Sequence, residues 1–407
     1  MQAELTLGFG ALIDRDPSLS GTNTSNAHEV ASLQFGVTSK TRTQDLSLRV
    51  SSEKISSFGA RGDLEVAYER RTKSSSFSAN LSSHMLPVGD VFVGDFTSGD
   101  AGLDLVAGRT DLRIYNGQFL IKSGIGRPVS TVLSYGINHR DLQNGASSTT
   151  RHKASAELRA RINSRTTGRV LSVYERLNTD AVLSQSQSAV AFGLNQKPTK
   201  LLEFDVQIGW RRIKADNRVQ TGAEWQTSIA RSLARGRVYG QASVERVEEG
   251  SVSSLAMGLT SSRRRGGSKL EVGVAKISAG STKPTLLLES GLNVKGAKLQ
   301  ASISRSFVGS DETGETRMGT KLFAKMMHDV GDRGDLQISM TYVRTDHTVL
   351  TDARSAGQLT ASYHHEIRRD WRWVAGAQRR VRRNSIDGRT GSNSVSFTFE
   401  RSFSGKF

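Results

Sequence analysis

The residues best placed to do chemistry are basic side chains in short segments where polar and apolar residues alternate. In each segment they occupy the same alternate positions as the other polar residues. In the segment 202–211, for example, Arg211 is in phase with Glu203 and Asp205, while the even positions are apolar. The basic residues assigned to polar faces in this way are Arg49, Arg113, Arg159, Arg161, Arg211, Arg317, Lys321, Lys325, Arg372 and Arg380. A surface lined by such cations raises the local concentration of anions and hinders cations.

Acidic side chains share these polar faces, so the basic side chains can have a second role as members of ion pairs. They include Glu65, Glu157, Glu203, Asp205, Glu271, Glu289 and Asp335. Opposite charges on neighbouring strands form cross-strand pairs, which hold the register without selecting a solute. Two alternatives therefore remain open, a surface that attracts anions and a surface whose charges neutralise one another.

The sequence contains none of the catalytic motifs that we searched for. His364-His365-Glu366 lacks the second histidine of a zinc-binding H-E-x-x-H helix, and neither a G-x-S-x-G elbow nor a phosphate-binding P-loop occurs. The spaced acids Asp90, Asp95, Asp100 and Asp104 do not follow the EF-hand pattern and indicate a solvated acidic loop. We expect no enzymatic activity, no cofactor and no metal site.

The elements that position the basic residues are strands with one apolar and one polar face. In 202–211 the apolar positions are Leu202, Phe204, Val206, Ile208 and Trp210. The same period of two recurs in 5–9, 33–37, 46–50, 64–68, 190–194, 270–274, 299–303, 335–342, 359–363 and 395–399. No segment of comparable length follows a helical period, so the pattern predicts an all-β chain.

The composition limits how such strands can assemble. Of 407 residues only 36% are apolar, the net charge is +17, and the chain has 5 Pro and no Cys. Soluble domains typically contain roughly 45–50% apolar residues with Gly included, while disordered chains are rich in Pro. The absence of Cys excludes a disulfide scaffold and a cysteine-ligated metal. A closed barrel with lipid outside and water inside needs few apolar residues, because only half of each strand is apolar.

Strand number and connection lengths support the barrel. Most candidate strands span about 9 to 11 residues, the length that a tilted strand needs to cross a bilayer. We predict about 22 antiparallel strands, within a range of 18 to 26, in one closed transmembrane barrel over residues 1–407, with both termini at the end of the shorter turns. A soluble basic β-sandwich or solenoid is the alternative class.

Residues 84–125 break the pattern. They begin with a stretch rich in Gly and Asp and end in two short apolar pieces, 110–116 and 119–125, joined at Asn116-Gly117. Asn-Gly between apolar pieces is a strong hairpin signal. The segment is either a long surface loop, which we favour, or a hairpin inserted into the barrel lumen.

Aromatic residues lie on the apolar faces, often near segment ends. We assign Tyr68, Trp210, Trp225, Tyr342, Tyr363, Trp371 and Trp373 to the girdles at the two membrane–water interfaces. Tyrosine and tryptophan are enriched there because their rings have an apolar body and a polar edge.

The alternation, the loop asymmetry and the aromatic C-terminus resemble the bacterial outer-membrane β-barrel proteins, in particular the porin-like barrels. In that class the last strand carries alternating apolar residues up to a terminal aromatic. Phe397, Phe399, Phe403 and Phe407 match this assembly signal, whereas Arg401 and Gly405 do not. The resemblance implies residence in the bacterial outer membrane, a signal peptide already removed, and outer-membrane lipid and the barrel-assembly machinery as partners.

Two dense basic runs, 263–265 and 379–383, are candidates for phosphate recognition, because guanidinium groups contact phosphates by bidentate, charge-assisted hydrogen bonds. Lipopolysaccharide and acidic polysaccharide are ligands of this kind, and solvated loops, which we favour for both runs, are the alternative. Nucleic acid is not expected as a partner, since no strand interleaves exposed aromatics with its basic residues.

The function that these patterns favour is passive passage of small hydrophilic, anionic solutes through a hydrated basic lumen. One alternative is an exit channel for an acidic exopolysaccharide. Another is a plugged barrel that acts as a structural or partner-binding scaffold.

Overall fold

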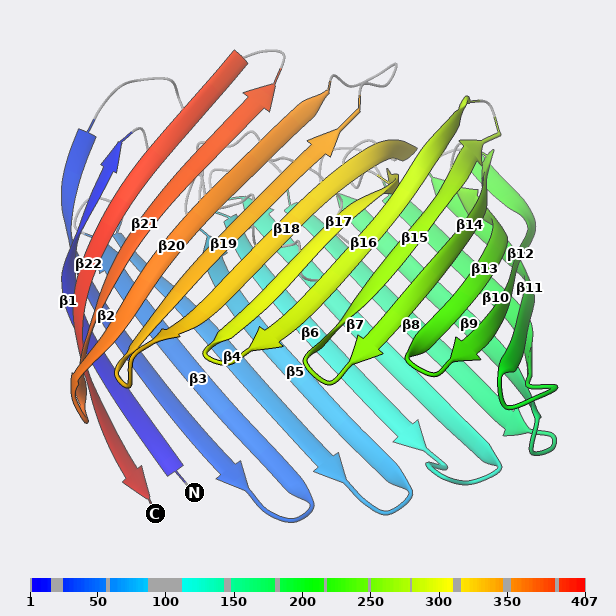
Figure 1. The fold of residues 1–407 in the computed structure, drawn as a ribbon, viewed down its shortest axis with the longest axis horizontal. Helices are drawn as coiled ribbons and strands as arrows, with labels where there is room; N and C mark the ends of the chain where they lie inside the picture. Colours follow the sequence, from blue (N-terminus) through cyan, green and yellow to red (C-terminus); the bar gives the residue numbers. More distant parts are fainter. Residues whose placement is uncertain are drawn as a thin grey trace.

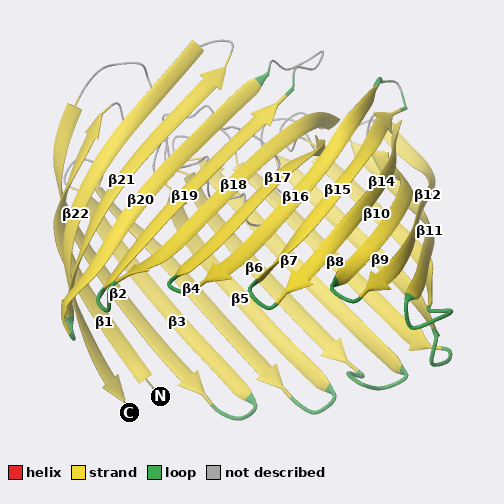
Figure 2. Cartoon of the chain, viewed as in Figure 1, coloured by secondary structure: helices red, strands yellow, loops and turns green. Residues whose placement is uncertain are grey.

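The computed structural model describes residues 2–15, 25–55, 59–86, 112–142, 148–179, 184–215, 218–247, 250–278, 280–309, 316–346, 353–384 and 388–406. These residues form strands joined by turns (Figure 2). Among them, no helical segment has the length and hydropathy of a transmembrane helix.

The described residues form 22 strands. The first eleven are β1 (Gln2–Arg15), β2 (Ser25–Lys40), β3 (Gln44–Ile55), β4 (Gly59–Arg71), β5 (Ser75–Leu86), β6 (Leu112–Ser123), β7 (Val129–Leu142), β8 (Ser148–Arg161), β9 (Thr166–Thr179), β10 (Ser184–Gln196) and β11 (Leu202–Ala215). The others are β12 (Arg218–Leu233), β13 (Gly236–Val247), β14 (Gly250–Arg263), β15 (Gly266–Ile277), β16 (Thr282–Val294), β17 (Ala297–Gly309), β18 (Thr316–Val330), β19 (Gly334–Thr345), β20 (Arg354–Arg368), β21 (Trp371–Asn384) and β22 (Gly388–Lys406).

Each strand pairs antiparallel with the next, and the first strand pairs with the last. In the closing pair, β1 and β22 are in register from Gln2 opposite Lys406 to Arg15 opposite Asn393. The single sheet of 22 strands therefore closes into a barrel of tilted strands (Figure 1). This confirms the predicted fold and strand number, and it excludes the soluble sandwich.

The two ends of the barrel differ in their connections. Both termini lie at one end, where the turns hold two to five residues (Figure 1). The opposite end carries the longest connection, 87–111. In outer-membrane barrels the short turns are periplasmic and the long loops extracellular. We therefore call the two ends of this barrel periplasmic and extracellular.

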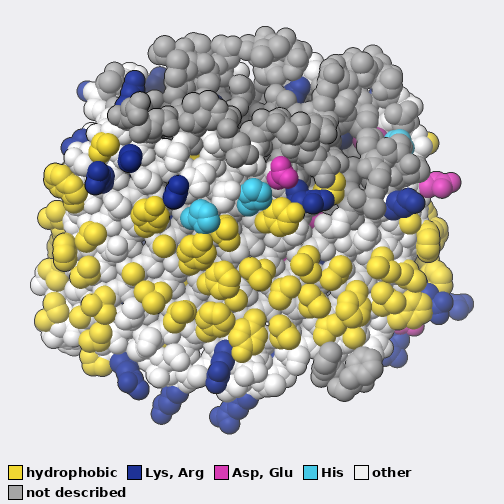
Figure 3. Space-filling model, turned by 180° about the vertical axis from the view of Figure 1, so that it is seen from behind, with side chains coloured by type: hydrophobic (Ala, Val, Ile, Leu, Met, Phe, Trp, Pro, Cys, Tyr) yellow, Lys and Arg dark blue, Asp and Glu magenta, His cyan; other side chains and the backbone are white. Residues whose placement is uncertain are grey.

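The apolar side chains face outward. Phe9, Phe192 and Met257 are each more than 60% exposed although they are large and apolar. On the face seen in Figure 3, apolar side chains form a band, bordered at both edges by Lys and Arg. The polar partners of each alternating strand point into the lumen. A lipid bilayer is the solvent that makes such an outer surface stable.

Glycines in the periplasmic turns allow backbone conformations that other residues rarely adopt. Gly124 has a φ of 72° and Gly296 a φ of 75°, both in the left-handed region. A Cβ atom at Gly124 would also lie 2.1 Å from the carbonyl oxygen of Val129. These glycines let adjacent strands reverse direction within a few residues.

The hairpin suggested by Asn116-Gly117 does not form, and the favoured surface loop is wrong for residues 112–123, which are a strand of the barrel wall. Both residues lie in the middle of β6, which pairs along its length with β5 and β7. Asn138 on β7 donates a hydrogen bond to the side-chain oxygen of Asn116, and a Cβ atom at Gly117 would lie 2.8 Å from the Ile137 side chain. Pairing on both sides outweighs the local turn preference. Residues 87–111 and the acids Asp90, Asp95, Asp100 and Asp104 lie outside the described residues.

The basic run 379–383 also differs from expectation, because it is part of a strand and not of a loop. Strand β21 continues to Asn384 and pairs with β20 and β22 throughout the run. Its arginines therefore alternate between the outer face, with Arg379 and Arg383, and the lumen, with Arg380 and Arg382.

Closure of the barrel depends on a close approach at Gly10. A Cβ atom there would lie 2.0 Å from the carbonyl oxygen of Phe397 on β22. We predict that Gly10→Ala weakens the closing pair, because overpacking of this kind costs about 1–3 kcal/mol. The variant should lose heat-modifiable gel migration at a lower temperature than the wild type. The control is Gly36→Ala on β2, where a Cβ atom would lie 3.9 Å from its nearest neighbour. Equal behaviour of the two variants would contradict the argument.

Candidate functional site: the inner wall of the barrel

The strand pairing places nine of the ten predicted basic residues on the inner face. Each of the nine is out of phase with the outward apolar residues of its own strand and of its neighbours. They are Arg49, Arg159, Arg161, Arg211, Arg317, Lys321, Lys325, Arg372 and Arg380. They are spread over strands β3, β8, β11, β18 and β21, so they line the lumen without meeting at one point.

Arg113 is the exception, and its predicted placement in the lumen is wrong. Its pairing partners, Met85 and Asp141, put it on the outer face together with Tyr115. Ile114, beside it, points inward and is only 6% exposed. The alternation around Ile114 had suggested that Ile114 faces outward and Arg113 inward. The pairing of β6 with β5 and β7 shows the reverse.

A network of charged and amide side chains covers the inner wall over strands β9 to β13. Arg169 donates to Asp205 at 2.7 Å and to Gln207 at 3.0 Å, and Asn195 donates to Glu203 at 2.7 Å. On the far side of Glu203, Arg237 contacts its other carboxylate oxygen at 3.3 Å. The network neutralises the charges of this periplasmic half of the wall.

A second network surrounds Arg211. Its Nε donates to Glu224 on β12 at 2.7 Å, and one terminal nitrogen donates to Gln187 on β10 at 3.0 Å. The other terminal nitrogen lies 3.3 Å from Glu245 on β13. One guanidinium thus joins four neighbouring strands and is balanced by two carboxylates.

Several other predicted lumen bases are also in ion pairs. Arg159 contacts Glu157 on its own strand at 2.7 Å, and Arg372 contacts Glu400 on β22. The acid Glu271 accepts hydrogen bonds from Tyr239 at 2.6 Å and from Gln241 at 3.0 Å. The cross-strand ion pairs of the inner wall are concentrated on strands β8 to β13.

The inner wall at β17 to β19 is different. Lys325 lies opposite Gln300 and Ser339, and Lys321 lies opposite Ser304 and Val343. With Lys298 and Arg317 these residues form what we call the basic stripe: Lys298, Arg317, Lys321 and Lys325. The register places neutral residues directly across from Lys321 and Lys325, and it places the acids Asp329 and Asp335 on the same face nearer the periplasmic end.

Near the closing seam, where β1 pairs with β22, side chains in the extracellular part of the inner wall are buried. Asp14, Arg380 and Ser392 are each less than 10% exposed. Arg380 contacts Asp14 at 3.3 Å and Ser392 at 3.1 Å, and Ser392 donates to Asp14 at 3.0 Å. This cluster links β21, β22 and β1 across the point of closure.

Sequence reasoning missed several members of these networks. Arg169, Glu224, Glu245 and Asp14 all lie in phase with the polar residues of their strands, so the period of two was the available signal. What alternation alone does not give is the register between strands. Register decides which acid meets which base, and it is set by the whole circuit of pairings.

All seven predicted interface aromatics point outward. Trp371, Trp373 and Tyr363 gather at the periplasmic end, where the rings of Tyr363 and Trp373 are 5.2 Å apart in an edge-on arrangement. Trp373 continues to Phe397 at 5.6 Å. The others, Tyr68, Trp210, Trp225 and Tyr342, lie on the outer faces of β4, β11, β12 and β19.

The residues of the predicted C-terminal assembly signal lie on the outer face of β22. Phe397, Phe399 and Phe403 share this face, whereas Phe407 lies outside the described residues. Arg401, at a position where an apolar residue was expected, stacks over Trp371 at 5.2 Å and over Phe403 at 4.7 Å. These cation–π contacts explain how a charge is accommodated on this face.

Comparison with known proteins identifies the fold. No family model matches the sequence, and no curated protein matches it. The structure is similar to the siderophore receptor PirA from Acinetobacter baumannii, with a TM-score of 0.55 and 10% identity over 98% of this chain and 80% of that chain. It is also similar to the FrpB iron transporter from Neisseria meningitidis, with a TM-score of 0.61 and 9% identity over 99% and 82% of the two chains.

These similarities concern the fold, because the identities are near 10%. The chain is a closed 22-stranded barrel like those of bacterial outer-membrane receptors, and its outward apolar band belongs in the lipid of that membrane.

The seam cluster generates a stability prediction. Arg380→Ala would leave Asp14 buried with a lost ion pair, and breaking a buried pair costs about 3–5 kcal/mol. We expect the variant to unfold at clearly lower urea concentration than the wild type, as followed by gel migration or tryptophan fluorescence. Arg379→Ala, which removes an exposed arginine from the adjacent position, should change stability little. Similar losses in both variants would show that the buried pair contributes nothing specific.

Proposed function

We propose that the protein is a passive outer-membrane channel for small hydrophilic anions. The observation that carries the proposal is the basic stripe, because it places four cationic side chains on the lumen face of two adjacent strands. Basic residues that line a pore raise the local anion concentration and oppose cations.

The division of the wall supports this selectivity. Over β9 to β13, Arg169, Arg211 and Arg237 have carboxylate partners within 3.3 Å, so their charges largely cancel. The stripe on β17 and β18 adds cationic side chains to the lumen face outside that network.

The test is planar-bilayer recording across a potassium chloride gradient. The wild type should conduct and show a zero-current potential on the chloride-selective side. Lys321→Gln with Lys325→Gln should lower the chloride-to-potassium permeability ratio by at least roughly fivefold, since one unit charge alone contributes about 1 kcal/mol to an ion a few ångströms away in water.

A matched control separates lumen charge from total charge. Lys276 lies in phase with Leu270, Val272 and Val274 on the outer face of β15. Lys276→Gln should leave the permeability ratio unchanged. Cation preference in the wild type, or an equal effect of the control, would overturn the proposal.

A second candidate is a plugged or partner-binding barrel, and buried side chains at the extracellular end of the inner wall favour it. Arg317, Thr345 and Ser392 on the inner face are each no more than 3% exposed, which an open, water-filled lumen would not produce. Known 22-stranded outer-membrane transporters have plugged lumens. Siderophore reception and iron transport, the roles named for the two similar structures, belong to this candidate.

The same recordings distinguish the two candidates. A folded, heat-modifiable barrel that conducts no ions supports the plugged barrel and contradicts the passive channel. Deletion of 88–110, which leaves β5 and β6 intact, should then open a large conductance. An exit channel for acidic polysaccharide would instead show block of an existing anion current by added polyuronate.

A further inference from the structure

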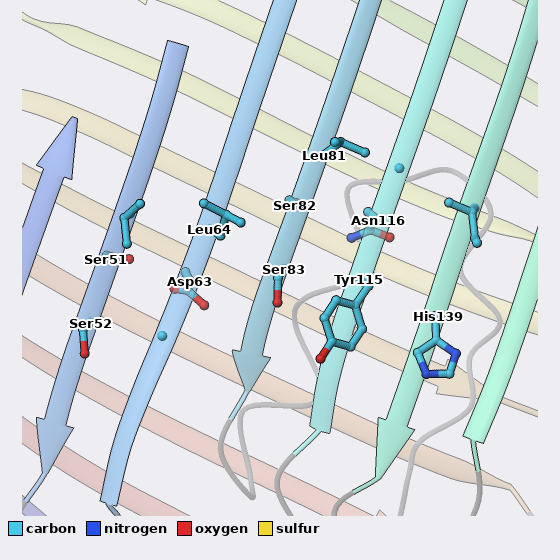
Figure 4. Close-up of a pocket in the computed structure, with 14 residues that line it drawn as sticks. Ser51, Ser52, Asp63, Leu64, Leu81, Ser82, Ser83, Tyr115, Asn116 and His139 are labelled. Carbon is cyan, nitrogen blue, oxygen red and sulfur yellow. The ribbon is translucent and has the colours of Figure 1, made fainter. Parts of the chain in front are cut away.

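The outer face of the barrel holds a recess of about 660 Å³ over strands β3 to β7 (Figure 4). Its apolar lining includes Leu64, Leu81 and Ile137, which are in phase with the outward residues of their strands. The recess exists because small residues interrupt the band. Gly62 has no side chain, and Ser83 lies between Leu64 and Tyr115 in the pairing register.

The extracellular end of the recess is polar. Tyr115 and His139 lie there side by side, on β6 and β7 (Figure 4), with ring centroids 5.8 Å apart. His139 is held through its Nδ1, which is 2.8 Å from the hydroxyl oxygen of Thr150. Arg113 donates to the Tyr115 hydroxyl at 3.4 Å. The recess is therefore apolar along the membrane and hydrogen-bonding at one end.

The surroundings of this polar end are rich in basic groups. Arg113 and His139 share the outer face with Lys54 on β3 and with His152 and Arg176, which lie opposite each other on β8 and β9. Asp141, opposite Arg113, is the acid in this group. On the outer surface in Figure 3, histidine and basic side chains border the apolar band on its extracellular side.

We propose that the recess binds lipid A, the acylated and phosphorylated anchor of lipopolysaccharide, with one acyl chain against Leu64, Leu81 and Ile137 and a phosphate at Arg113 and His139. An acyl chain restores the dispersion contacts that a hollow in the apolar surface lacks. Phosphates form strong charge-assisted hydrogen bonds with guanidinium groups. The connection lengths put this end of the barrel in the outer leaflet.

The proposal does not depend on the channel function, because the site lies on the lipid-facing side of the wall. The experiment uses the full chain refolded in detergent from denatured, lipid-free protein. Native mass spectrometry with added purified lipid A should show one retained adduct on the wild type. Arg113→Ala with His139→Ala should weaken its binding at least tenfold.

The matched control removes two cations elsewhere at the same end of the outer surface. Arg212 and Lys214 are exposed and in phase with Trp210 on the outer face of β11. Arg212→Ala with Lys214→Ala should leave lipid A binding unchanged. Equal loss in both double variants would show non-specific charge attraction and would overturn the proposal, as would a wild type without an adduct.

Two further arms test the apolar part and the identity of the lipid. Ser83→Phe fills the recess without altering its charges and should weaken the adduct as strongly as loss of the cations. Heat-modifiable migration verifies that each variant is folded. Phosphatidylglycerol, an anionic lipid without the glycolipid's phosphorylated sugars, should bind at least tenfold more weakly than lipid A. Equal binding of the two lipids would overturn the assignment to lipid A.

Discussion

The need to pair every backbone polar group away from water is the constraint on which this structure depends. In hydrocarbon an unpaired N–H or C=O costs several kcal/mol, so a sheet must have no edge. The chain meets this requirement by pairing β1 with β22 along 14 residues of β1. Once the sheet is closed, the two faces of every strand have different solvents. The apolar band, the charged lumen and the outward-facing aromatic residues all follow from that difference.

The architecture was predictable because its signal is repeated. Each alternating segment is weak evidence alone, but the same period of two in 202–211, 335–342 and many other segments points to one fold. The failures occurred where local patterns and global pairing disagree. The local sequence predicts a turn at Asn116-Gly117 and a lumen position for Arg113. Pairing of β6 with β5 and β7 overrides both predictions. Register is a property of the whole circuit, so the ion-pair partners of Arg211 were beyond reach.

The charges of the inner wall are unevenly distributed, and this matters more than their total. Arginines on β9 to β13 are matched with carboxylates at 2.7 to 3.3 Å, which stiffens that side of the barrel and cancels its field. The lysines on β18 lie opposite serine, glutamine and valine. A net charge of +17 therefore says little about how charge is distributed over the lumen.

The buried contact between Arg380 and Asp14 has a consequence for how the barrel is made. These residues are 366 positions apart in the chain, so the contact that closes the sheet has nearly the largest sequence separation available. Interactions between distant residues form late, because the loop between them must first be ordered. Until then the first and last strands expose unpaired edges that invite aggregation. Assembly of this barrel is therefore expected to be slow, cooperative and dependent on protection of the two terminal strands until they meet.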